Sequence, residues 1–180
     1  MDAVSNGLIT TTYPHHEVHE GASFRCVAVD TTLDDTETLS LAFQTPAGTK
    51  RAHMLIGWAT AGAAHVELLE GPTWDDQSGT AAVIWNRFRD TPGSSVLLED
   101  QAQAAFTASD ALHMNPTTLA GGDSIELGRD FSSTKNTSQN RGSAEWVLDP
   151  GVQYAILLTS DVNGSSGFIE LDWYEHTDSH

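Results

Sequence analysis

The chain has 180 residues, with 25 Asp and Glu against 8 Lys and Arg, so its formal charge is −17. This length fits one domain, or one domain with an arm, and is enough to close a sizeable core. The charge excludes nucleic-acid binding through phosphate contacts, which need clustered positive charge. No apolar run approaches the ~20 residues of a membrane span, and the N-terminus lacks the basic and apolar regions of a signal peptide.

The acid excess also bears on the surroundings of the protein. Only two of the basic residues are lysines, Lys50 and Lys135. At molar salt the Debye length falls to ~3 Å, and the self-repulsion of such a chain largely vanishes. We interpret the composition as that of a halophilic protein working in concentrated brine. The alternative is an ordinary acidic surface, and the salt dependence of folding distinguishes the two.

The N-terminal residues divide into an arm and a candidate contact segment. Residues 1–14 are polar without an amphipathic period, so we expect an extended arm followed by one domain over 15–180. His15, Glu17 and His19 would share one face of a strand. The spacing is not that of a zinc-protease helix. We therefore interpret the segment as a solvated strand entry, with a metal site as the alternative.

Period-two patterning and turn residues predict strands along most of the chain. The expected strands cover 24–29, 39–44, 53–59, 65–69, 81–88, 96–98, 124–127, 143–148, 154–159 and 168–174. In the strand over 81–88, Val83, Trp85 and Arg87 share one face. The alanine-rich residues 101–112 are the one plausible helix, and 128–142 predicts a long exposed loop. Asn136 and Asn163 match the N-glycosylation pattern.

The C-terminal region predicts a hairpin. Asn163 and Gly164 adopt positive φ at low cost, as a tight turn between two strands requires. In the second strand Phe168, Glu170, Asp172 and Tyr174 would point one way, and the residues between them the other. One face is thus expected to be buried, and the other to contact water or a partner.

These features together predict an all-β fold. Eight to ten short strands with turn chemistry between them are typical of an antiparallel β-sandwich, jelly-roll-like, with at most one short helix. The single cysteine, Cys26, lies in an apolar run and is expected to be buried and inert.

Motifs of enzymes and cofactor sites are absent from the sequence. It contains no nucleophile elbow, phosphate-binding glycine loop, dinucleotide fingerprint or zinc pattern. We expect no enzymatic activity and no cofactor, with at most weak, opportunistic divalent cation binding at the acidic residues 30–38. Trp74, in an acidic loop, is the best candidate for an exposed ligand contact.

Several short segments, in this order, resemble the small β-sandwich proteins that decorate or cement the heads of tailed viruses. The resemblance spans nearly all of 13–176. The matching segments are His16 to Phe24, Leu69 to Thr73, Gly79-Thr80, Asn86-Arg87, Glu145 to Leu148, Tyr154 and Leu171 to His176.

The resemblance implies a virion structural protein without catalysis, located on the outer capsid surface of a bacteriophage or a haloarchaeal tailed virus. It implies two partners, the major capsid protein and further copies in a homotrimer, and neither nucleic acid nor membrane. The expected contact residues are Tyr13, His15, Glu17, His19, Tyr174 and His176. The alternative is a carbohydrate- or receptor-binding module of a tail or spike, with Trp74 and the loop over 128–142 as its binding surface.

Overall fold

The computed structural model describes residues 17–75, 78–90, 92–97, 111–131 and 145–177. They form an all-β structure, as the sequence predicts. The strands are β1 (Ser23–Leu33), β2 (Thr38–Gln44), β3 (Lys50–Thr60), β4 (Ala64–Glu70), β5 (Thr80–Asn86), β6 (Ala111–Met114), β7 (Asp123–Asp130), β8 (Trp146–Val147), β9 (Gln153–Ser160) and β10 (Ser165–Thr177).

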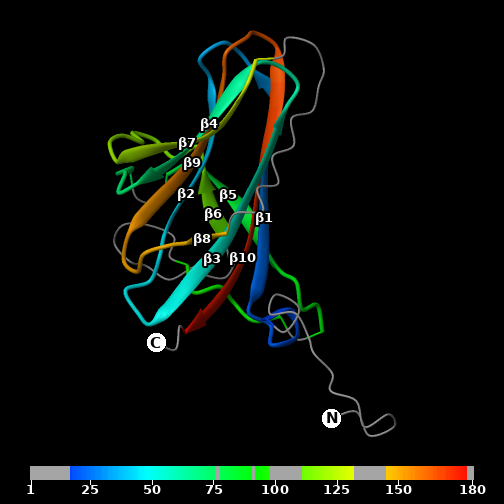
Figure 1. Cartoon of the computed structure of the whole chain (residues 1–180). Coiled ribbons are helices and arrows are strands. Elements are labelled where there is room, and N and C mark those ends of the chain that lie inside the picture. Colours follow the sequence, from blue (N-terminus) through cyan, green and yellow to red (C-terminus); the bar gives the residue numbers. More distant parts are fainter. Residues whose placement is uncertain (1–16, 76–77, 91, 98–110, 132–144, 178–180) are drawn as a thin grey trace, which may run out of the picture.

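The strands form one long antiparallel sheet that folds over into two layers (Figure 1). The first layer has the order β5-β1-β10-β3-β8, and the second has the order β6-β2-β9-β4-β7. Strand β5 joins the layers, because it pairs with β1 through one half and with β6 through the other. If β5 and β6 are set aside, the first layer has the order β1-β10-β3-β8 and the second has the order β2-β9-β4-β7. Strands at the same position in the two orders are neighbours in sequence. This is the order of a jelly roll.

The connection between β9 and β10 is an arch, so the predicted C-terminal hairpin is wrong. Strand β9 pairs with β2 and β4, whereas β10 pairs with β1 and β3 in the other layer. A short turn with a positive-φ glycine, here Gly164, serves an arch between layers as well as a hairpin within one. Local turn chemistry therefore could not decide between them.

Two further arches, β1 to β2 and β3 to β4, lie beside this one at the top of Figure 1. Backbone bonds join them: the amide of Thr36 donates to the carbonyl of Ser160, and that of Asp161 to the carbonyl of Ala63. The carboxylate of Asp34 accepts from the amide of Gly164 at 2.9 Å. The three turns therefore hold one another in place and fix the separation of the layers.

The core lies between the layers and is almost entirely apolar. Inward residues of β10 and β1 meet there: Trp173 stacks on Phe24 with ring centroids 5.6 Å apart. From the other layer, Leu41, Ile156 and Leu158 are fully buried. Cys26 is buried as expected, and burial raises the pKa of its thiol to about 12. The predicted alternation of β10 is confirmed except at Glu170, which points outward but is 6% exposed.

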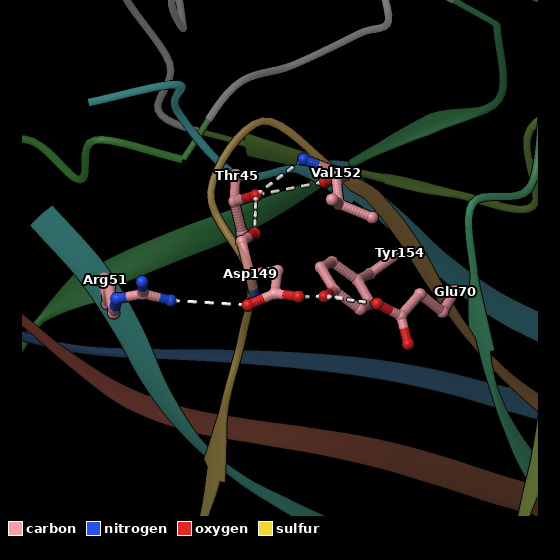
Figure 2. A network of polar contacts seen from close by, with 6 residues as sticks. All are labelled: Thr45, Arg51, Glu70, Asp149, Val152 and Tyr154. Atoms are coloured by element: carbon pink, nitrogen blue, oxygen red, sulfur yellow. Dashed lines mark hydrogen bonds and ion pairs between the residues drawn. The ribbon is translucent and has the colours of Figure 1, made fainter. Parts of the chain in front are cut away.

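Asp149 anchors the loop before β9 at the other end of the sandwich (Figure 2). Arg51 of β3 lies 3.3 Å from the Asp149 carboxylate. The phenol of Tyr154 accepts from the Asp149 amide at 3.0 Å and donates to Glu70 at 3.2 Å. Burial, first among several causes, raises the pKa of Tyr154 to about 12. Thr45 completes the network with bonds to the Asp149 and Val152 backbones.

Glu175 is a buried carboxyl that secures the segment 93–97 against the end of β10. It is 3% exposed and accepts hydrogen bonds from the hydroxyl of Ser95, the amide of Val96 and the indole of Trp173. Burial raises the pKa of this carboxyl above its ordinary value of 4.5, and the hydrogen bonds oppose that shift. Segment 93–97 is not a strand, and hydrogen bonds to this carboxyl hold it against β10.

Some local predictions need correction. Residues 17–19 form a single helical turn, closed by bonds from the Gly21 and Ala22 amides to the Val18 and Glu17 carbonyls, and not a strand entry. Residues 96–97 are not a strand. Of the predicted helix over 101–112, the described end belongs to strand β6, because it pairs with β2 and β5. The arm over 1–14 and Asn136 lie outside the described residues.

A substitution at Gly62 tests how closely the arches pack against one another. An added Cβ there would lie 2.6 Å from the Val162 side chain and 2.9 Å from the Ser165 hydroxyl. We expect Gly62→Ala to lower the free energy of unfolding by about 1–3 kcal/mol, the usual cost of overpacking. Gly48→Ala is the control, since nothing lies within 4 Å of its added Cβ. Equal urea midpoints for the two variants would contradict the described arch packing.

Variants of Glu175 test whether its carboxyl is buried and hydrogen-bonded as described. Because its folded pKa lies above 4.5, the native state binds more protons than the unfolded state between the two values. Its contribution to stability therefore falls as pH rises through that window. Glu175→Gln should remove this fall while keeping an acceptor, and Glu175→Ala should cost about 3 kcal/mol, because buried donors lose their acceptor.

Urea unfolding at several pH values and constant high salt measures both effects of the Glu175 variants. The quantity of interest is the difference between wild type and Glu175→Gln, since the other carboxyls titrate in both proteins. A difference that does not change with pH would show that Glu175 is not held as described.

Candidate interaction surface

The outward side of the layer β5-β1-β10-β3-β8 carries most of the large apolar side chains that the described residues expose. We call this side the exposed face. It has six of the seven such side chains, with exposed fractions from 37% to 57%: Val27, Val29, Leu55, Val83, Trp85 and Val147. The seventh, Phe131, follows β7 in the other layer. Clustering of this kind marks interaction surfaces, because single apolar residues are otherwise scattered.

The register explains how residues far apart in sequence gather there. Paired residues of antiparallel strands point to the same side. Arg25 of β1 pairs with Trp85 of β5 and with Asp172 of β10, and Asp172 pairs with Leu55 of β3. Val147 of β8 pairs with His53 of β3. One row across β5, β1, β10 and β3 therefore presents its side chains outward, and the neighbouring row adds His53 of β3 and Val147 of β8.

Charges of both signs occupy the middle of the exposed face. Arg25 lies 2.7 Å from the Glu170 carboxylate and 3.7 Å from that of Asp172, which Arg87 approaches at 3.6 Å. Two arginines and two carboxylates cancel in formal charge. In a chain of charge −17, this centre is a locally balanced patch.

Trp85 is the largest exposed side chain of this face, at 54%. The guanidinium of Arg89 lies over its ring, 5.4 Å from the centroid. Arginine and tryptophan are the residue types that dominate binding energy at protein interfaces. Trp85 and the neighbouring arginines thus have the composition of an interface hot spot.

One end of the exposed face consists of stacked rings. The rings of His53, Tyr174 and His176 all contact one another: the His53 centroid lies 4.8 Å from that of Tyr174 and 4.3 Å from that of His176, and the last two are 5.8 Å apart. Glu145 accepts from the Tyr174 hydroxyl at 2.7 Å and contacts the Nδ1 atom of His53 at 2.5 Å. These contacts hold the rings rigidly, so they can present a preformed surface to a partner.

A shallow apolar hollow of about 240 Å³ lies at the opposite end of the same face. Val29 of β1, Ala59 of β3 and Phe168 of β10 line it, and Asp30 lies at its rim. The face therefore offers a recess as well as a protruding ring.

In the other layer, Trp74 covers the outward side of strands β2 and β9. Trp74 is only 4% exposed and packs on Ala42 and Ala155, with Leu69 among the partly buried residues around it. An isolated pair of backbone bonds between Thr73 and Ala120 holds this covering loop in place. The prediction of Trp74 as an exposed ligand contact is wrong, because the acidic sequence around it did not reveal that it covers a sheet.

The structure brings some of the other predicted contact residues together: Glu17 and His176 line one polar hollow with Lys50 and Glu175. Tyr174 and His176 lie together on the exposed face. His19 is exposed. Glu17 is only 3% exposed, so its side chain offers little surface to a partner. Tyr13 and His15 lie outside the described residues.

Sequence reasoning missed most of the exposed face. The pattern grouped Val83, Trp85 and Arg87 on one side of a strand but did not say which side was exposed. The alternation of β1 carried a further signal: Arg25, Val27 and Val29 alternate with buried residues. The pattern sets Phe24, Cys26 and Ala28 on one side, but it does not show that the valines on the other side are exposed, because a valine-rich strand is also typical of a core.

Three other properties bear on function. In the described ranges, no group of three or more His, Cys, Asp or Glu side chains is placed to hold a metal ion. Also within those ranges, no helix has the length and apolar character needed to cross a membrane. Comparison with protein-family models, curated proteins and solved structures found no match.

The two tryptophans give a matched test of the surface assignment. Trp74→Ala should lower the free energy of unfolding by about 3–5 kcal/mol, because it empties a packed site. Trp85→Ala should change it by no more than about 1 kcal/mol in dilute protein at low salt, because about half of the ring is already in water. Urea unfolding followed by circular dichroism measures both. A larger loss for Trp85→Ala than for Trp74→Ala would reverse the described sides.

Proposed function

We propose that the protein is a structural component of a virion, which decorates the outer surface of the icosahedral capsid of a tailed virus. The observation that carries the proposal is the exposed face: a rigid sandwich with one covered and one uncovered sheet is built for association. Segments such as His16 to Phe24 and Leu171 to His176 resemble head-decoration proteins. This resemblance is the reason for proposing a virion as the structure to which the protein attaches. The proposed role needs no catalytic step.

The sandwich has the physical properties that attachment requires. Its layers are joined by arches whose backbone groups bond to one another. Association of such preformed surfaces loses little conformational freedom, so more of the contact energy appears as affinity. The Tyr174 and His53 stack, held by Glu145, extends this rigidity to the exposed face.

The charge fits the proposed setting in brine. A shell made of many copies with a formal charge of −17 each would repel itself in dilute buffer. At about 1 M salt, charges more than ~3 Å apart are screened. Association through a charge-balanced, apolar face is then favoured, since salt weakens repulsion but does not weaken apolar burial.

The alternative of a carbohydrate- or receptor-binding module loses its main support. It relied on Trp74 and on the loop over 128–142 as the binding surface. Trp74 is buried, and residues 132–142 lie outside the described part of the chain. The capsid proposal therefore has the better basis.

Immunogold electron microscopy of the virus that encodes this chain tests the proposal. Antibodies against the recombinant protein should label intact particles over the whole head. Quantitative mass spectrometry of purified particles should find many copies per particle. Label confined to the tail or spikes would overturn capsid decoration, and so would absence of the protein from purified particles.

A further inference from the structure

We infer that the exposed face pairs with the same face of a second copy, in a two-fold dimer. The inference uses the same face on which the proposed function rests: a second copy would occupy this face in the free protein, and attachment to a capsid through it would have to displace that copy. The two remain separable, because the dimer is tested on the purified protein alone and capsid decoration on virus particles. The inference also differs from the homotrimer that the sequence resemblance implies, since a dimer of identical faces is closed by two copies.

Charge is the first argument for a second copy. Each chain has a formal charge of −17, so most approaches between two copies bring carboxylates together. The exposed face is different, because Arg25 and Arg87 balance Glu170 and Asp172 at its centre. A contact centred there does not add like charges at close range.

The distribution of basic residues strengthens this argument. The described ranges contain six Lys and Arg residues, and three of them, Arg25, Arg87 and Arg89, lie at the exposed face. When two such faces meet, Arg25 and Arg87 of one copy, with side chains 38% and 48% exposed, can approach Asp172 of the other, which is 19% exposed. Glu170 stays paired with its own Arg25. An isologous interface needs this self-complementarity, since each residue type must find its complement in the same patch.

The shape of the exposed face can also complement itself, because it has both a protrusion and a hollow. Trp85 protrudes with 54% of its area exposed, and the hollow beside Val29 and Phe168 has a volume of about 240 Å³. One face therefore supplies both a protruding ring and an apolar recess. Residues that are buried at the centre of interfaces are often aromatic anchors seated in such recesses.

The available area is sufficient. The five strands hold 44 residues, and at about 3.3 Å along a strand and about 4.8 Å between strands they cover roughly 700 Å² of flat sheet, to which protruding side chains add accessible area. A standard stable interface buries about 800 Å² on each partner. The exposed face can therefore hold one complete dimer contact.

Sedimentation velocity of the full chain in increasing KCl tests the inference. We expect a dimer whose dissociation constant falls as KCl rises from about 0.1 M to about 3 M, because salt screens the overall repulsion and strengthens apolar burial. A monomer at about 100 μM protein in high salt would overturn the inference, because a stable interface of this size exceeds that affinity. A trimer would overturn it as well.

Variants locate the contact. Trp85→Ala and Val27→Lys should each weaken the dimer about tenfold or more, as expected for hot-spot positions. Phe131→Ala is the matched control, because Phe131 is 83% exposed but lies outside the exposed face, and it should leave the dimer unchanged. Circular dichroism confirms that each variant is folded. A dimer that only Phe131→Ala weakens, or that no variant weakens, would overturn the inference.

Discussion

The alternation of β10 is the constraint on which the rest of the structure depends. Its inward residues, among them Leu171 and Trp173, form the centre of the core, and its outward residues Glu170 and Asp172 form the charged centre of the exposed face. A shift of one residue in pairing would exchange the two sets. Because β1 and β3 pair with β10 along most of its length, one register fixes the core and the surface together.

The two layers have different outward sides, and this asymmetry is the basis of the functional proposals. Trp74 and its loop cover the outer side of the layer that contains β2 and β9. The other outer side keeps Trp85 and several valines exposed. Leaving apolar side chains in water costs free energy that their burial would recover. An uncovered sheet beside a covered one is therefore best explained as a surface that a partner completes.

Charge and apolar area play complementary parts in this picture. The acidic surface keeps copies apart in dilute solution, and concentrated salt removes that barrier. The balanced group around Arg25 then allows close approach where the apolar side chains lie. The proposed association at one face is compatible with this overall charge.

The limits of sequence reasoning show in particular residues. Period two correctly placed Trp173 in the core and Asp172 outside it, because side-chain alternation is a local property of an extended chain. It placed Trp74 wrongly, since an acidic loop gives no local sign of the sheet beneath it. It also took the turn at Asn163 and Gly164 for a hairpin, because arches and hairpins use the same residues.

The sequence by itself determined the all-β class, the inward and outward sets of β10, and the acidity of the surface. All of these follow from composition and from patterns a few residues long. Tertiary structure alone decided which outward side is covered, and that Arg25, Trp85 and Leu55 share one face, because those outcomes depend on strand pairing between residues far apart in the chain. That pairing is set by the packing of the whole core, so no local pattern could reveal it.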